Sequence, residues 1–158
     1  MRGQRVLELG AGLGLCGILA SHWEATQVVL TDGDTDALAG LRTNVTQNAA
    51  TYRCPSVRTA QLVWGEGLDD FTHTYGSTFD SILGADIIYV EEILQPLWAT
   101  VDRLLSAEGV FLLAYARRNV SMDLVLAQAT ARDFLWETPA DAEGVYLFRR
   151  RRQEETGG

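Results

Sequence analysis

The sequence has little or none of several residue types, and each shortage excludes a class of protein. Lysine is absent, so all 13 basic residues are arginine. Cys16 and Cys54 are too few for a disulfide framework and lack the spacing of a zinc site. No stretch approaches the about 18 consecutive apolar residues of a membrane span, and residues 1–6 lack the apolar segment of a signal peptide. We therefore expect a cytoplasmic protein with no membrane contact and no metal site.

Size and charge narrow the possibilities further. The 158 residues suffice for one domain with a core, and 47% apolar and 22% charged residues are typical of a globular chain rather than a disordered or fibrous one. The formal net charge is −8, although four consecutive arginines, Arg149 to Arg152, lie near the C-terminus. An acidic body repels phosphate backbones. We therefore expect no nucleic-acid partner and favour a basic ligand.

Short apolar runs alternate with helical patterns along the chain. This alternation predicts an α/β fold with a doubly wound, mostly parallel sheet, and ligands beyond the carboxyl ends of its strands. We expect a domain over residues 1–148 and a flexible tail over 149–158. The expected strands are Val6–Leu9, Gln27–Thr31, Val57–Leu62, Phe79–Gly84 and Val110–Tyr115, followed by an antiparallel pair, Phe134–Thr138 and Val145–Phe148. The expected helices carry Leu15, Ile18 and Leu19, begin after a cap at Asp34, and span Ile93–Leu105 and Val120–Ala131.

A glycine-rich segment, Val6 to Gly17, joins the first expected strand to the first helix. Its Gly-x-Gly-x-x-Gly spacing begins at Gly12, and Asp32 follows 20 residues later, which formally matches a dinucleotide fingerprint. Glu8, however, ends the strand just before the glycine turn. A carboxylate there would lie close to a pyrophosphate bound at the following helix, so the pattern disfavours a dinucleotide.

S-adenosylmethionine fits the same segment without a charge conflict. It carries no phosphate but has an ammonium and a sulfonium, both of which suit Glu8. The glycines let the backbone approach the amino-acid part of the cofactor, and Asp32 can accept hydrogen bonds from both ribose hydroxyls. We therefore expect this cofactor at the turn; the alternative is a nucleotide-type fold with another ligand.

The segment from Phe79 to Tyr89 adds a second motif, Phe-Asp-Ser-Ile-Leu-Gly-Ala-Asp-Ile-Ile-Tyr. With it, the sequence resembles the seven-strand, class I protein-lysine methyltransferases of the methyltransferase-like group, whose members modify chaperones, AAA ATPases and translation elongation factors. The resemblance spans nearly the whole chain. Four parts are similar to the group's motifs: residues 6–17 to its first motif, 30–32 to its second, 62–65 to its Trp-Gly signature, and Asp86 with Tyr89 to its Asp-x-x-Tyr element.

The resemblance implies a Rossmann-like methyltransferase fold that transfers a methyl group from S-adenosylmethionine to a lysine of a protein. It implies that Asp86 and Tyr89 shape the lysine channel, and that Trp64 lies beside the adenine. Family members also have a covering segment ahead of the first motif, whereas Met1 lies five residues before Val6, so we expect that segment to be missing. The implied cofactor contacts are Gly10, Ala11, Gly12, Asp32, Trp64 and Ala85.

Two neighbouring arginines, Arg117 and Arg118, follow the fifth expected strand. They could pair with acidic residues or contact the substrate.

The sequence also leaves two other functions open. One is methylation of a small molecule, and the other is a non-catalytic remnant of the fold that acts as a binding module. Each of three site residues also has an alternative role in the structure: Tyr89 and Trp64 could be core aromatics, and Asp86 could be a helix cap. An acidic rim that attracts a lysine-bearing surface is expected from Glu66, Asp69, Asp70, Glu91 and Glu92.

Overall fold

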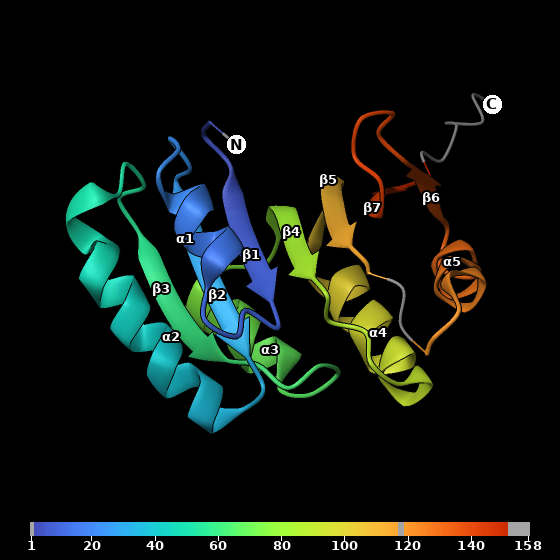
Figure 1. The fold of residues 1–158 in the computed structure, drawn as a ribbon, viewed down its shortest axis with the longest axis horizontal. Coiled ribbons are helices and arrows are strands. Elements are labelled where there is room, and N and C mark those ends of the chain that lie inside the picture. The colour runs from blue at the N-terminus through green and yellow to red at the C-terminus, as the bar shows by residue number, and fades with distance from the viewer. Residues whose placement is uncertain (1, 117–118, 152–158) are drawn as a thin grey trace.

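One sheet of seven strands organises the residues that the computed structural model describes, 2–116 and 119–151. The strands are β1 (Arg5–Leu9), β2 (Gln27–Asp32), β3 (Val57–Gln61), β4 (Phe79–Ala85), β5 (Leu105–Ala114), β6 (Phe134–Glu137) and β7 (Val145–Arg150). Their order across the sheet is β3-β2-β1-β4-β5-β7-β6 (Figure 1). The first five strands pair in parallel, whereas β7 is antiparallel to both β5 and β6. The expected mostly parallel sheet with a closing antiparallel pair is therefore confirmed.

Helices pack on both faces of the sheet, and the sheet separates two apolar cores. The helices are α1 (Leu15–Ser21), α2 (Thr35–Asn48), α3 (Leu68–Tyr75), α4 (Leu94–Leu104) and α5 (Met122–Thr130), with short 3-10 turns η1 (Ala49–Thr51) and η2 (Glu91–Ile93). Leu30 and Leu41 belong to the core beneath α1 and α2. Trp98 and Phe111 belong to the larger core on the side of α3, α4 and α5. Each fully buried side chain of this size contributes about 1.5–3 kcal/mol of transfer free energy.

One part of the sheet has no helix over it. Figure 1 shows α1 in front of β1 and β2, and no described helix in front of β4 and β5. Leu112 on that side of β5 is consequently only half-buried, whereas its neighbour Leu113 is fully buried on the other side. Two of the leucines expected in the first helix, Leu15 and Leu19, are 80% and 54% exposed. The apolar face of α1 is thus only partly used in packing.

One helix and two strand boundaries differ most from those expected. Helix α3 was not expected, and its capping position, Gly67, has a left-handed backbone rather than a capping side chain. Strand β5 begins at Leu105, because a register shift against β4 accommodates the polar residues that follow. Strand β7 continues to Arg150, and the N–H of Arg151 donates to the carbonyl of Asp133. The strand therefore extends beyond residue 148, where we expected the domain to end.

The strand order decides where a ligand can bind. The chain leaves β1 toward β2 on one side and returns to β4 on the other, so the loops that follow β1 and β4 diverge at the carboxyl edge. Such a reversal of strand order opens a crevice at that edge in doubly wound sheets.

Within the described ranges, no helix is both long enough and apolar enough to cross a bilayer. Arg117, Arg118 and residues 152–158 lie outside the described residues.

Candidate active site

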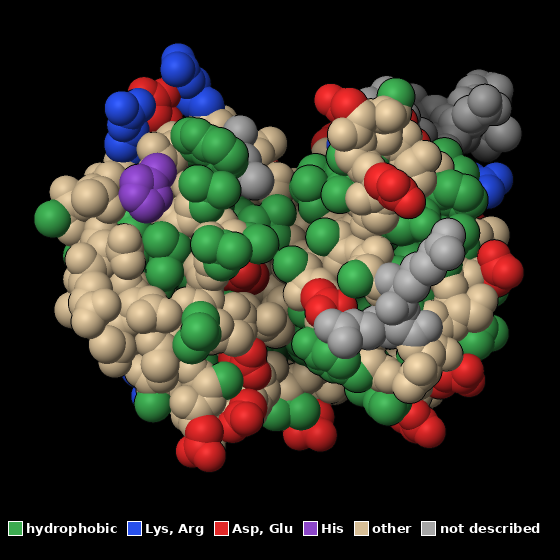
Figure 2. Space-filling view, viewed as in Figure 1, with side chains coloured by type: hydrophobic (Ala, Val, Ile, Leu, Met, Phe, Trp, Pro, Cys, Tyr) green, Lys and Arg blue, Asp and Glu red, His purple; other side chains and the backbone are tan. Residues whose placement is uncertain are grey.

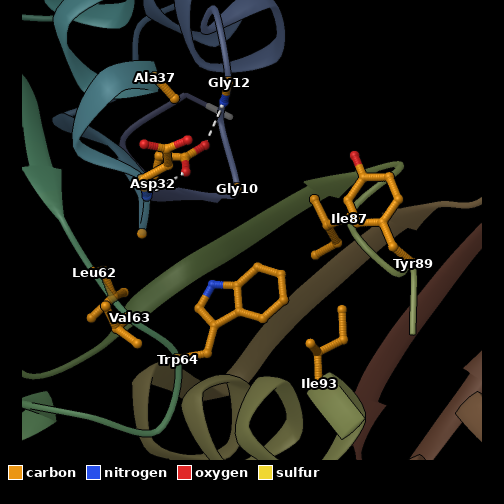
Figure 3. Close-up of a pocket in the computed structure, with 12 residues that line it drawn as sticks. Gly10, Gly12, Asp32, Ala37, Leu62, Val63, Trp64, Ile87, Tyr89 and Ile93 are labelled. Carbon is orange, nitrogen blue, oxygen red and sulfur yellow. Dashed lines mark hydrogen bonds between the residues drawn. The ribbon is translucent and has the colours of Figure 1, made fainter. Parts of the chain in front are cut away.

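A cleft of about 490 Å³ lies at the carboxyl ends of β1, β2 and β4 (Figure 3). The glycine turn after β1 and Asp32 at the end of β2 form one end. Leu62, Val63 and Trp64, which follow β3, form one wall, and Ile87, which lies against Gly10, forms another. Tyr89 and Ile93 form the other end. The cleft therefore joins the loops of four different strands, as expected from the crossover.

The glycine turn brings bare backbone into the cleft. Gly10 has a φ of +60°, which favours glycine, and a β-carbon there would lie 2.8 Å from Cγ2 of Ile87. The N–H of Ala11 donates to the carbonyl of Thr31 at 2.8 Å, which fixes the turn against β2. Ala11 itself does not line the cleft. A substituent at Gly10 would thus displace the wall formed by Ile87.

Asp32 organises its end of the cleft. Its Oδ2 accepts a hydrogen bond from the N–H of Gly12 at 2.9 Å, drawn as a dashed line in Figure 3, and its Oδ1 accepts one from the N–H of Asp34 at 3.0 Å. A carboxylate offers about four acceptor positions, so each oxygen retains capacity for a further donor. The arrangement suits a ligand with two neighbouring hydroxyl groups, because both oxygens belong to one fixed carboxylate.

Glu8 lies beneath α1 rather than in the lining of the cleft. Its side chain is 3% exposed, and its Oε2 accepts the N–H of Gly17 at 2.9 Å. Burial raises the pKa of Glu8 to about 7; the N–H groups of Gly17 and Cys16 oppose this rise, and the charge of Asp32 adds to it. Burial, together with the charge of Glu8, also raises the pKa of Cys16. Direct contact between Glu8 and a ligand stays a prediction.

Aromatic and aliphatic groups make up the rest of the cleft. Trp64 is half-buried, and Tyr89 is 57% exposed. Figure 3 places Tyr89 and Asp32 at opposite ends, with the indole of Trp64 between them. Apolar side chains of this kind suit the face of a planar ring. Ile87 and Ile93, which also line the cleft, were not predicted as site residues from the sequence. Ile87 could have been predicted from its place inside the Asp-x-x-Tyr element.

Asp86 marks the turn that follows β4. Its φ is +54°, a left-handed conformation that aspartate tolerates better than most residues. Its N–H donates to the carbonyl of Ala114 at 2.8 Å, so this turn is fixed to the end of β5. Ala85 is exposed at the end of β4.

The cleft brings together five of the nine predicted site residues: Gly10, Gly12, Asp32, Trp64 and Tyr89. Its lining does not include the other four, which are Glu8, Ala11, Ala85 and Asp86.

Acidic side chains gather at the edge that holds the cleft. Figure 2 shows them along the lower edge of the molecule, toward which β1, β2 and β4 point in Figure 1. Glu66, Glu91 and Glu92 of the expected rim are exposed, whereas Asp69 pairs with Arg103 at 3.0 Å. An exposed pair of this kind contributes little stability. No cluster of three possible metal ligands occurs among the residues that the structure describes.

The fold is shared with S-adenosylmethionine-dependent methyltransferases of known structure. The TehB-like methyltransferase of Corynebacterium glutamicum superposes with a TM-score of 0.70 at 20% identity, over 96% of this chain and 82% of that one. The expected Rossmann-like class I methyltransferase fold is therefore confirmed.

Sequence comparison places the chain in one family of this class. It matches the model of a family described as lysine methyltransferase over residues 1–132. Protein N-lysine methyltransferase METTL21A of Danio rerio is 36% identical over 150 residues, 94% of this chain and 66% of the relative. Calmodulin-lysine N-methyltransferase of Arabidopsis thaliana is 34% identical over 109 residues, 68% of this chain and 34% of the relative. EEF1A lysine methyltransferase 3 of Mus musculus is 36% identical over 117 residues, 74% of this chain and 47% of the relative.

The chain belongs to the lysine methyltransferase family. This membership confirms the resemblance read from the motifs. The chain spans about 66% of the length of the zebrafish relative.

Proposed function

We propose that this protein transfers a methyl group from S-adenosylmethionine to a lysine side chain of a protein substrate. The observation that carries the proposal is the arrangement of one cleft in which bare backbone at Gly10, the carboxylate of Asp32 and the indole of Trp64 face a common space. These groups fit the amino-acid part, the ribose and the adenine of that cofactor. Membership in the lysine methyltransferase family supports the same chemistry.

The residues around the cofactor have separable roles in this proposal. Gly10 and Gly12 would supply backbone to the cofactor, Asp32 would accept the ribose hydroxyls, and Trp64 would pack against the adenine. Ala11 does not line the cleft, and its predicted role is to hold the glycine turn against β2. Ala85 lies at the end of β4, next to the reacting end. Glu8 stabilises the glycine turn and the start of α1 through Gly17, and its charge favours the nearby ammonium of the cofactor. When bound, the cofactor supplies an electrophilic methyl group.

The acceptor side is formed by the turn after β4. The lysine amine must lose its proton before it attacks, and its unperturbed pKa is about 10.4. Apolar side chains at Ile87 and Ile93, with the ring of Tyr89, desolvate an entering ammonium and so lower its pKa. The hydroxyl of Tyr89 can orient the nitrogen toward the methyl group, and Asp86 holds the turn. Positioning and exclusion of water supply much of the rate enhancement in such a reaction.

We also propose that the substrate is a protein with an accessible cationic surface, of the chaperone, AAA ATPase or elongation-factor classes. The exposed acidic groups at the cleft edge support a cationic surface on the substrate, because they attract lysine side chains. The three classes of substrate follow from the resemblance to the methyltransferase-like group. The domain expected over residues 1–148, with β7 continuing to Arg150, would carry the activity. The two free cysteines, Cys16 and Cys54, support a reducing cytoplasmic location, which imaging of the tagged protein would test.

Methyl transfer can be tested with a defined panel of proteins. The protein is incubated with S-adenosylmethionine labelled in its methyl group and with unmethylated calmodulin, EEF1A, a chaperone and an AAA ATPase. Because the 158-residue chain contains no lysine, labelled methyl-lysine in the hydrolysate must come from the added protein. We expect methyl-lysine from at least one of them, and at least about tenfold less of it with Asp32→Ala at limiting cofactor. Methyl-arginine as the main product, or no labelled protein, would contradict the proposal.

A further inference from the structure

The proposed function assigns no role to Thr100, a polar residue of helix α4 whose side chain is fully buried. Its neighbours Leu97, Trp98 and Val101 on the same helix are also fully buried, and they belong to the larger apolar core. A hydroxyl group in such surroundings costs free energy unless it forms hydrogen bonds. The partners of this hydroxyl therefore show what the residue does.

The hydroxyl of Thr100 forms two hydrogen bonds. It donates to the carbonyl of Pro96, one turn earlier in α4, at 2.9 Å, and its Oγ1 accepts the N–H of Gly65 at 2.8 Å. Because a hydroxyl has one proton, the bond to Pro96 leaves the lone pairs of Oγ1 for Gly65. Gly65 lies 35 residues earlier in the sequence, in the loop that follows β3. The second bond thus fixes this loop to α4.

Trp64 and Gly65 are the two central residues of a β-turn in that loop. The N–H of Glu66 donates to the carbonyl of Val63 at 3.1 Å, which closes the turn. Gly65 has a φ of +81°, near the value of about +80° that the third residue of a type II turn adopts and that favours glycine. A β-carbon at Gly65 would lie 3.1 Å from Cβ of Pro96, so the turn lies directly against α4.

The same turn carries Trp64 into the cleft that we propose for the cofactor, called the cofactor cleft below. Figure 3 shows the indole of Trp64 directed into this cleft, and its Cζ2 would lie 3.4 Å from a β-carbon on Gly10. Types I and II of a β-turn differ by a rotation of the central peptide, which here joins Trp64 to Gly65. The hydroxyl of Thr100 holds the N–H of this peptide and thereby selects one of the two orientations.

We infer that Thr100 is a positioning residue for the cofactor: its hydroxyl holds the turn that presents the indole of Trp64 to the adenine. This inference rests on the proposed function and goes beyond it, because Thr100 is not among the described residues that line the cofactor cleft. Supporting hydrogen bonds of this kind keep the side chain that contacts a ligand in its productive geometry. Loss of the hydroxyl should therefore weaken cofactor binding through Trp64.

Variants of Thr100 and Trp64 test this inference by titration calorimetry with S-adenosylhomocysteine, the product that the cofactor leaves after methyl transfer. Thr100→Val keeps the shape of the side chain but removes the acceptor for Gly65, whereas Thr100→Ser keeps the hydroxyl. Thr100→Ala removes the hydroxyl as well and serves if Thr100→Val does not fold. Each variant that lacks the hydroxyl is also combined with Trp64→Ala in a double-mutant cycle.

Val101→Thr is the matched control for a general disturbance of the core. It places a hydroxyl at the next position of α4, which is equally buried and whose apolar side chain makes no hydrogen bond to the turn. We expect Val101→Thr to lower the free energy of unfolding, since it buries an extra polar group, while the affinity for S-adenosylhomocysteine stays within about twofold.

We expect Thr100→Val and Thr100→Ala to weaken the binding of S-adenosylhomocysteine at least about fivefold, the effect of losing one hydrogen bond, and Thr100→Ser to stay within about twofold. In the Trp64→Ala background, loss of the hydroxyl should change the affinity less than about twofold, because the indole that it positions is absent. Unchanged affinity without the hydroxyl, an equal loss in Thr100→Ser or Val101→Thr, or the same loss without Trp64 would overturn the inference alone. Absence of S-adenosylhomocysteine binding by the unaltered protein would instead overturn the proposed function.

Discussion

Ile87 packs so tightly against Gly84 that a β-carbon added at Gly84 would lie 2.6 Å from Cδ1 of Ile87. The same isoleucine approaches Gly10, where an added β-carbon would lie 2.8 Å from Cγ2. One buried side chain thus spans the space between β4, the glycine turn and the cleft. Its position couples the cofactor end of the site to the turn that carries Tyr89.

Gly84→Ala and Ile87→Val should therefore compensate each other. Alone, Gly84→Ala overpacks this contact and should lower the free energy of unfolding by about 1–3 kcal/mol. Ile87→Val alone should cost about 0.5–1.5 kcal/mol, and because valine lacks Cδ1, the double variant should be more stable than the sum of the two effects predicts. Denaturant unfolding of all four proteins measures this coupling. Strict additivity would show that the contact is not tight.

Asp32→Ala should weaken the binding of S-adenosylhomocysteine by about 1.5–3 kcal/mol, the range for hydrogen bonds to a charged group. The variant also removes the acceptor for the N–H of Gly12, so part of the loss should come from a looser glycine turn. Asp36→Ala, in the first turn of α2 and outside the cleft lining, is the control. Titration calorimetry measures both. Unchanged affinity in Asp32→Ala, or tighter binding of NAD than of S-adenosylmethionine, contradicts the assigned cofactor.

Tyr89→Phe should reduce kcat about tenfold, since the loss of one orienting hydrogen bond of about 1.4 kcal/mol corresponds to that factor. The affinity for the cofactor should change little, because the hydroxyl is assigned to the acceptor side. Tyr75→Phe, a half-buried tyrosine of α3, removes a hydroxyl outside the cofactor cleft and serves as the control. Equal kcat values for Tyr89→Phe and the unaltered protein would remove this hydroxyl from the mechanism.

Glu8→Gln should reveal a pH-dependent cost of burying the carboxyl. Its pKa is raised from 4.5 to about 7 in the folded protein, so across this window the unfolded chain loses the proton first. The contribution of Glu8 to the free energy of unfolding therefore falls as the pH rises from about 4.5 to about 7, and is constant above that range.

Glutamine keeps an oxygen for the N–H of Gly17 but does not titrate. The stability of Glu8→Gln relative to the unaltered protein should consequently rise between pH 5 and pH 8 by up to a few kcal/mol. Urea unfolding at a series of pH values measures the difference. A difference that is independent of pH would show that Glu8 ionises normally in the folded protein.

The sequence predicted those parts of the fold whose signals are local. The strands β1 and β2 are short segments rich in Val and Leu because both of their faces are buried, and such segments are easily recognised even though Glu8 and Thr31 interrupt the apolar pattern. Helix α3 was missed although Leu68, Phe71 and Tyr75 have helical spacing, because eight residues among glycines and threonines give a weak pattern. The exposure of Leu15 could not be predicted, since it depends on what covers α1 in three dimensions.

The residues of the candidate site likewise fall into those that the sequence could predict and those that it could not. Asp32 and the glycine turn were recognisable because their spacing is short and their chemistry is specific. Ile87 was not, because its role comes from contacts with Gly10 and Gly84 that only the packed sheet brings together. Glu8 was placed on the correct strand end, but the helix above it, rather than the open cleft, receives its carboxylate.

The reversal of strand order at β1 and β4 has a consequence for how such a protein can diversify. The glycine turn, Asp32 and Trp64 all come from the first half of the chain, whereas Ile87, Tyr89 and Ile93 come from the second half. Under the proposed function, the first stretch of sequence would bind the methyl donor and the second would bind the acceptor. Mutations in the second stretch should then change the target while the affinity for the donor stays the same. Chimaeras exchanged between β3 and β4 should accordingly inherit the target preference of their C-terminal parent.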